Sequence, residues 1–120
     1  MLARGAAKII IVSNVEDALA LRSEGVGHLC MGEVGGRSPF GFDALQANVQ
    51  GMTVIQRTSA GTQGLMAAKY ATQRYAGALV TAKATARAVL RHSPAQVMLV
   101  AMGEDGVLRA DEDELCAIHL

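Results

Sequence analysis

The sequence predicts an α/β fold, a three-layer α/β/α sandwich in which helices cover both faces of a mostly parallel sheet of about five strands. Short apolar runs without polar alternation recur along the chain, which is typical of strands buried on both faces. Helix-like stretches that begin with capping or acidic residues separate these runs. The alternation favours parallel crossover units, whose ligands bind at the carboxyl ends of the strands.

The first half of the chain supplies three of the expected strands. We expect them at residues 8–13, 28–31 and 52–58. Asn14 is expected to cap a helix with Asp17 at its third position, and Gly25 and Gly27 to end it. Residues 42–50 are ambiguous and fit at most one helical turn.

The second half predicts two further strands and three helices. The strands are expected at residues 77–81 and 96–102, and the helices at residues 62–70, 84–91 and 111–120. Ser93 and Pro94 break the second of these helices. Acidic residues fill the first turn of the last helix, as the helix dipole favours.

Length and composition predict one domain over residues 1–120, with a core of aliphatic side chains because only 3% of the residues are aromatic. Eleven basic and eleven acidic residues give no net charge, so there is no electrostatic footprint for nucleic acid or an anionic membrane. The longest apolar runs are too short to span a bilayer, and the N-terminus lacks a cleavable signal pattern. The two cysteines form neither a disulfide framework nor a zinc spacing, which favours the reducing cytoplasm.

A glycine-rich loop follows the second expected strand. Glu33 is followed by Gly35, Gly36 and Arg37, and Asp43 lies a little further on. Glycines let a backbone approach a ligand closely, and two carboxylates flanking them could hold a hard cation. The alternative is a solvated glycine turn with surface acids.

A Ser/Thr/Gly turn follows the third expected strand, at residues 57–62. The hydroxyls of Thr58, Ser59 and Thr62, together with backbone N–H groups from Gly61 onward, could cradle phosphate oxygens. The turn has no P-loop lysine and the wrong spacing, so nucleoside triphosphate hydrolysis is disfavoured. The alternative is an ordinary threonine N-cap after a tight turn.

Acidic residues follow the fifth expected strand, at Glu104 and Asp105 and again at residues 111–114. One of them turned inward could bind magnesium or position a water, whereas the alternative is that they only complement the helix dipole. Cys116 lies about one helical turn after Asp113 and is either a small core residue or a nucleophile. Cys30, in the middle of a strand, is expected in the core. The three histidines share no ligand spacing, and no hydrolytic triad is visible.

These segments, taken in order, resemble the 2-phosphosulfolactate phosphatase family of coenzyme M biosynthesis. Residues 12–20 look like its first strand-to-helix connection. Residues 32–36 and 41–43 are similar to its Gly-Glu-Arg-Gly-Gly and Gly-Phe-Asp loop. Residues 58–62 lie where it carries an Asn-Gly-Thr or Ala-Gly-Thr turn, and residues 112–117 resemble its Glu-Asp-x-Leu-Cys-Ala segment.

The resemblance implies a cytoplasmic, magnesium-dependent phosphatase of α/β/α fold that hydrolyses 2-phosphosulfolactate or a related small phosphomonoester, sulfonated or not. The substrate-binding candidates are Gly35, Gly36, Arg37, Arg57, Thr58, Ser59, Gly61 and Thr62. Within this set, Arg37 or Arg57 would offset the second anionic group of the substrate. The candidates for holding Mg²⁺ or positioning water are Glu33, Asp43 and Asp113, and Cys116 is a further catalytic candidate.

The chain also departs from the family pattern. Val34 replaces the arginine of the glycine loop, and residues 44–47 replace a Gly-Asn-Ser-Pro segment. A preceding strand with an Asp and an Arg and a C-terminal portion are missing, so the chain resembles the middle of the family domain. An exposed sheet edge favours pairing with another chain, so we expect a homo-oligomer. The alternative function is a non-catalytic remnant that binds anions or oligomerises; a Rossmann-like nucleotide binder lacks its Gly-x-Gly-x-x-Gly fingerprint.

Overall fold

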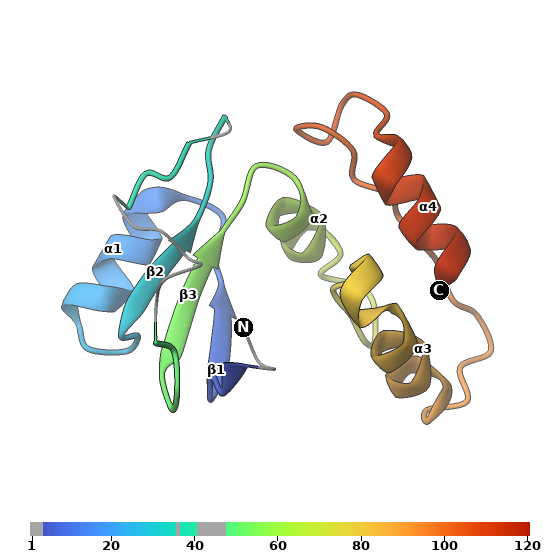
Figure 1. Ribbon diagram of the computed structural model, residues 1–120, viewed down its shortest axis with the longest axis horizontal. Helices are drawn as coiled ribbons and strands as arrows, with labels where there is room; N and C mark the ends of the chain where they lie inside the picture. The colour runs from blue at the N-terminus through green and yellow to red at the C-terminus, as the bar shows by residue number, and fades with distance from the viewer. Residues whose placement is uncertain (1–3, 36, 41–47) are drawn as a thin grey trace.

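The computed structural model describes residues 4–35, 37–40 and 48–120. Its first half holds a parallel sheet of three strands, β1 (Lys8–Ile11), β2 (Leu29–Gly32) and β3 (Thr53–Arg57). The strand order is β1-β3-β2, so β3 lies in the centre (Figure 1). All three strands overlap strands expected from the sequence. β1 and β3 are shorter than the expected runs, and β2 has the expected length but begins and ends one residue later.

The pairing register places matching apolar residues side by side. Ile55 of β3 lies opposite Ile10 of β1 and Cys30 of β2, and Val54 lies opposite Ile9 and Leu29. Because successive side chains of a strand point to opposite faces, Val54 and Ile55 are both fully buried on different sides of the sheet. The sheet therefore has two small cores.

Helix α1 (Val15–Ser23) covers one of the two faces. Asn14 caps it as expected, since its side-chain Oδ1 accepts the N–H of Asp17 at 2.7 Å. Ala18 of this helix is fully buried in a cluster with Val12, Cys30 and Ile55. The small side chain at Ala18 lets α1 approach the sheet closely.

The other face of the sheet carries a second cluster, made by Ala6, Met31, Val49 and Val54. None of these four residues belongs to a helix. Among the described residues, a helical layer is thus seen on one face of the sheet, and the expected three-layer sandwich is not formed by them.

The second half of the chain is helical. It contains α2 (Gly61–Ala67), a 3₁₀ turn η2 (Leu79–Thr81), α3 (Ala82–Leu90) and α4 (Asp111–His119). Helices α3 and α4 contact each other, and Figure 1 shows them beside the sheet with α2 in between. The expected helices are thus present, with α2 three residues shorter at its C-terminal end than the expected run.

The structure has three strands instead of about five. Residues 77–81 form an irregular stretch that ends in η2, and residues 96–102 have no regular secondary structure. Short apolar runs do not distinguish a buried strand from other buried segments, and a strand forms only where a neighbouring strand offers its N–H and C=O groups. In the described residues no such neighbour lies beside either segment, so both strand predictions are wrong for this structure.

Within the described residues, no helix is long and apolar enough to cross a membrane.

Candidate functional site

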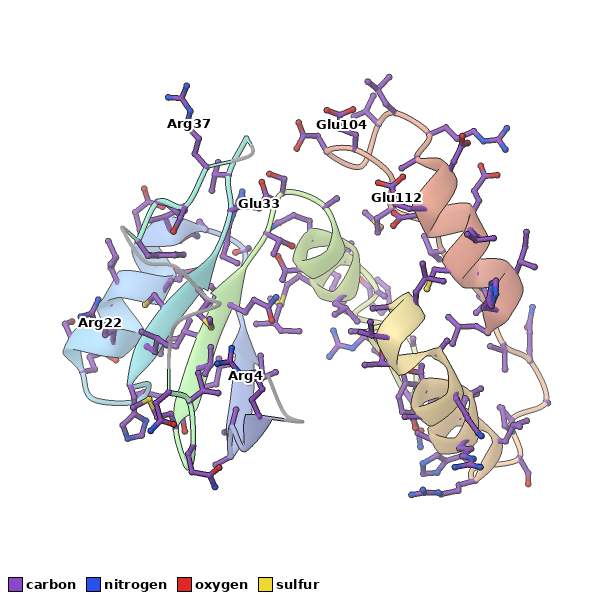
Figure 2. The ribbon with its side chains drawn as sticks, viewed as in Figure 1. Arg4, Arg22, Glu33, Arg37, Glu104 and Glu112 are labelled. Atoms are coloured by element: carbon purple, nitrogen blue, oxygen red, sulfur yellow. The ribbon has the colours of Figure 1, made fainter. Side chains whose placement is uncertain are left out.

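The candidate site lies where the three parallel strands end. Ser13 follows β1, Glu33 follows β2, and Thr58 and Ser59 follow β3. Because parallel strands present their carboxyl ends at one edge, and β3 is central, the turn after β3 lies between the other two. Figure 2 shows Glu33 beside the connection from β3 to α2.

The carboxylate of Glu33 is bound by Ser59. The Ser59 N–H donates to Glu33 Oε1 at 2.7 Å, and the Ser59 hydroxyl donates to Glu33 Oε2 at 3.1 Å. The same hydroxyl oxygen accepts the N–H of Gly35 at 3.1 Å. Two segments that the sequence analysis singled out separately, the glycine loop and the Ser/Thr turn, are thus joined through three hydrogen bonds.

Arg57, the last residue of β3, ties the ends of the other two strands to it. Its Nε donates to the carbonyl oxygen of Ser13 at 3.3 Å, and its Nη1 donates to the carbonyl oxygen of Glu33 at 3.4 Å. These two bonds use two of the five N–H donors of the guanidinium group. Arg57 therefore brings a half-buried positive charge to the same edge of the sheet as the Glu33 carboxylate.

Thr58 and Thr62 fix the turn that connects β3 to α2. The Thr58 N–H donates to Thr62 Oγ1 at 2.8 Å, and the Thr62 N–H donates to Thr58 Oγ1 at 3.2 Å. The Thr62 hydroxyl also donates to the Thr58 carbonyl oxygen at 3.0 Å, and the residue is only 4% exposed. These reciprocal bonds hold the turn in shape, so in this structure the Thr62 hydroxyl acts inside the turn, whereas Ala60, the N-cap of α2, makes no side-chain capping bond.

Two residues of the site carry contacts that the sequence analysis did not assign to them. The side-chain amide of Gln63 donates to the carbonyl oxygens of Ser13 at 3.0 Å and Thr58 at 3.3 Å, which links the ends of β1 and β3. Gly32 has φ +139, and a Cβ atom there would lie 1.6 Å from the carbonyl oxygen of Arg57. Gly32 therefore permits the close approach of β2 to β3 directly before Glu33.

The remaining candidates of the glycine loop lie around a tight turn. Val34 and Arg37 pair through two backbone hydrogen bonds, Val34 N–H to Arg37 O at 2.8 Å and Arg37 N–H to Val34 O at 3.2 Å. Figure 2 shows the Arg37 side chain pointing away from the sheet at the tip of this turn. Gly35 has φ +57 with open space beside it. Gly36 and Asp43 lie outside the described residues.

Gly61, the first residue of α2, needs no special backbone conformation. A Cβ atom at this position would meet only the Thr58 hydroxyl oxygen, at an ordinary 3.8 Å. Packing of the described residues therefore does not require a glycine here.

Asp113 and Cys116 belong to α4. Asp113 Oδ2 accepts the N–H of Gly103 at 2.6 Å, which fixes the chain that leads into α4. Cys116 is buried and unpaired with Cys30. Figure 2 shows the neighbouring Glu112 on α4 and Glu33 at the end of the sheet. No three His, Cys, Asp or Glu side chains of the described residues form a group that could hold a metal ion.

Cys30 lies in the core, as expected. Its thiol donates to the carbonyl oxygen of Ala18 at 3.2 Å. Burial raises the pKa of the Cys30 thiol, and the positive charge of Arg22 opposes this shift. The thiol is therefore held in its protonated, unreactive form.

Two curated proteins are similar to this chain. A probable 2-phosphosulfolactate phosphatase of Carboxydothermus hydrogenoformans is 36% identical over 109 residues, which cover 87% of this chain and 45% of the relative. Another, of Deinococcus radiodurans, is 32% identical over 120 residues, which cover 93% of this chain and 50% of the relative. The chain thus spans about half the length of the curated relatives it matches.

The sequence profile of the 2-phosphosulpholactate phosphatase family matches residues 1–120, the whole chain. The resemblance carried by the glycine loop, the Ser/Thr turn and the segment around Cys116 is thereby confirmed, and the chain belongs to the 2-phosphosulpholactate phosphatase family.

Proposed function

We propose that this chain carries the phosphate-binding part of a phosphatase that hydrolyses 2-phosphosulfolactate, or a related small phosphomonoester, to the hydroxy acid and inorganic phosphate. Membership of the family supports the reaction class. The observation that carries the proposal is the contact between Ser59 and the Glu33 carboxylate. An anion already lies against the N–H and the hydroxyl of Ser59, at the carboxyl edge of a parallel sheet.

The Glu33 carboxylate occupies the position at Ser59 where, in this proposal, a phosphate oxygen of the substrate binds. A phosphate oxygen placed against Ser59 would receive the same two donors that the carboxylate receives now. Backbone N–H and hydroxyl donors that are fixed before the substrate arrives stabilise developing charge most effectively. Arg57 would offset part of the negative charge, because its guanidinium group is anchored at the same edge. In this proposal Thr58, Thr62 and Gln63 hold the turn in shape, and Ser59 touches the substrate.

Magnesium is part of the proposal. Mg²⁺ in proteins is commonly held by one or two carboxylates, with water and substrate phosphate completing its shell. Glu33 is proposed as one such carboxylate, because it lies at the carboxyl edge of the sheet beside Ser59. Asp43 is proposed as a second, and Asp113, which binds Gly103 in this structure, as an alternative. When bound, the ion would supply positive charge to the phosphoryl oxygens.

The decisive experiment measures phosphate release from 2-phosphosulfolactate and simpler phosphomonoesters by the folded chain, with and without magnesium. Ser59→Ala is expected to lower the rate by about a hundredfold, as removal of one fixed oxyanion donor does elsewhere. Ser23→Ala is the matched control, because Ser23 is an exposed serine of α1 whose hydroxyl, among the described residues, binds the Ala20 carbonyl oxygen alone. The proposal fails if the folded chain does not turn over any of these substrates, or if both variants behave alike.

A second candidate function is a non-catalytic domain that binds anions or oligomerises. The small sheet and the many exposed apolar residues of the second half favour it. In that case ³¹P resonance titrations would show phosphate binding that depends on Ser59, without turnover. We also propose that the chain is a homo-oligomer and that it works in a reducing compartment such as the cytoplasm, where its two free cysteines remain reduced.

A further inference from the structure

The side-chain amide of Gln63 has one orientation that fits its contacts. Gln63 lies in the first turn of α2 and is half-buried. Its amide nitrogen donates to the carbonyl oxygens of Ser13 at 3.0 Å and Thr58 at 3.3 Å. Carbonyl oxygens only accept hydrogen bonds, so a flipped amide would place its own oxygen against both of them. The two bonds therefore fix which end of the amide faces the strand ends.

The bond from Gln63 to Thr58 acts on the N–H group of Ser59. The Thr58 carbonyl and the Ser59 N–H belong to one planar peptide unit, in which the oxygen and the hydrogen point in opposite directions. The Thr58 oxygen accepts the Gln63 amide and also the Thr62 hydroxyl, which lies at 3.0 Å. Two donors on this oxygen restrict rotation of the whole peptide unit. The Ser59 N–H is thereby directed at Glu33 Oε1, which lies 2.7 Å from the nitrogen.

The same bonds make the Ser59 N–H a stronger donor. Donors on a carbonyl oxygen draw electron density away from the N–H of the same peptide unit, and hydrogen bonds in such a chain reinforce one another. Here the chain runs from the Gln63 amide through the peptide between Thr58 and Ser59 to the Glu33 carboxylate. Gln63 can therefore strengthen the binding of an anion at Ser59 without touching that anion.

The bond from Gln63 to Ser13 places the amide beside Arg57. The Ser13 carbonyl oxygen accepts the Gln63 amide at 3.0 Å and Arg57 Nε at 3.3 Å. Arg57 Nη1 donates in turn to the carbonyl oxygen of Glu33 at 3.4 Å. One oxygen at the end of β1 is therefore shared by the guanidinium group and by the amide that orients the Ser59 peptide. Gln63 thus links the N–H donor of the candidate site to its positive charge.

We propose that Gln63 is a positioning residue of the anion site. It orients the Ser59 N–H through the Thr58 carbonyl group, and it keeps Arg57 beside that donor through the Ser13 carbonyl group. This role rests on the proposed function, because the anion that Ser59 and Arg57 would bind is the phosphate group of the substrate. The alternative is that Gln63 only attaches the start of α2 to the sheet, in which case its loss loosens the whole turn.

Gln63→Met is the test variant, because methionine is similar in length and uncharged but has no N–H donor. In the ¹⁵N-labelled chain we expect the amide proton resonance of Ser59 to move upfield, since its hydrogen bond to Glu33 weakens. The amide proton of Thr58, which donates to Thr62 Oγ1 in the same turn, is expected to keep its position. An unmoved Ser59 resonance overturns the proposal, and so does an equal shift of both resonances, which would indicate a loosened turn.

Gln63→Lys separates the effect of orientation from the effect of charge. The ammonium group of lysine can donate to both carbonyl oxygens that Gln63 binds now. We therefore expect this variant to bring the Ser59 resonance back toward its position in the unmodified chain. If Gln63→Lys binds phosphate tightly while the Ser59 resonance stays where Gln63→Met places it, charge acts in place of orientation and the proposal is overturned.

Titration with inorganic phosphate, followed by ³¹P resonance, connects this orientation to anion binding. Gln63→Met is expected to bind phosphate at least about fivefold more weakly, the effect of about one hydrogen bond. Gln73→Met is the matched control, because Gln73 Oε1 accepts the Tyr75 hydroxyl at an exposed position between α2 and η2. Unchanged phosphate binding in Gln63→Met, or an equal loss in the control, overturns the proposal. If the unmodified chain binds no phosphate, the proposed function fails, whereas the Ser59 resonance still decides whether Gln63 orients that N–H.

Discussion

Replacing Gly32 with alanine is the sharpest test of how the fold positions Glu33. Gly32 has φ +139, a backbone conformation that residues other than glycine rarely adopt. Forcing alanine into it costs about 1–3 kcal/mol of stability. The new Cβ atom would also lie 1.6 Å from the carbonyl oxygen of Arg57. A backbone atom cannot turn away as a side chain can, so β2 and β3 must separate at this point.

The separation breaks ladder contacts at the end of both strands. The hydrogen bond from the Glu33 N–H to the Arg57 carbonyl oxygen, which is 3.1 Å long, is expected to break first. One or two lost hydrogen bonds add about 1–3 kcal/mol to the backbone strain. We therefore expect Gly32→Ala to lower the free energy of unfolding by about 2–6 kcal/mol, a large part of the stability of a small domain.

Gly25→Ala is the matched control for this substitution. Gly25 also has positive φ, +75, but a Cβ atom there meets nothing within 4 Å. Gly25→Ala is expected to lower the free energy of unfolding by only about 1–2 kcal/mol, which is the cost of the left-handed conformation alone. Urea unfolding followed by circular dichroism measures both variants. If Gly32→Ala is no less stable than Gly25→Ala, the close contact between β2 and β3 is not as described.

Three further predictions concern the first half of the chain. Ile55→Ala is expected to cost about 2–5 kcal/mol in urea unfolding, because Ile55 is fully buried at the centre of the sheet; a cost below that of a surface substitution would contradict the described core. Asn14→Ala is expected to cost about 1 kcal/mol through loss of the cap on the Asp17 N–H, whereas Ser23→Ala, at an exposed position near the end of the same helix, should cost less. Since burial raises the pKa of Cys30 in the folded chain, the unfolded chain loses this proton first. Stability should therefore fall as pH rises above the ordinary thiol pKa, and Cys30→Ser should flatten that fall in unfolding curves measured across the alkaline range.

Local signals were sufficient to predict the first half of the fold. The uninterrupted apolar runs at β1, β2 and β3 and the Asn14 cap act over a few residues, so they are readable without knowing what surrounds them. The formation of the strands expected at residues 77–81 and 96–102 depends on long-range contacts instead. A strand needs a neighbouring strand, and no periodicity in an isolated run of Leu and Val reports whether that neighbour is present.

The same distinction applies to the candidate site. Joining Glu33 to Ser59 was predictable, because both follow parallel strands and the carboxyl ends of such strands meet at one edge. Asp113 was expected there because its helix follows the expected fifth strand; that helix is present as α4, but the strand is not, and Asp113 binds the N–H of Gly103. Gln63 carries no signal in the sequence, since its contact with Ser13 links residues that are fifty positions apart.

The bond between Glu33 and Ser59 has a consequence for any anion that binds at this turn. A phosphate oxygen can reach the Ser59 N–H only by displacing the Glu33 carboxylate, now 2.7 Å away. If the displaced carboxylate stays close, it repels the phosphate at a separation where two like charges interact by several kcal/mol at the dielectric of a protein surface. Arg57 offsets part of this repulsion, but a dianion beside a carboxylate leaves negative charge in excess.

Phosphate alone is therefore expected to bind weakly, and a divalent cation that binds Glu33 should strengthen phosphate binding. The coupling is reciprocal, so phosphate should strengthen binding of the cation by the same factor. In Glu33→Gln the repulsion is absent, and phosphate binding without a cation should improve while its dependence on the cation is lost.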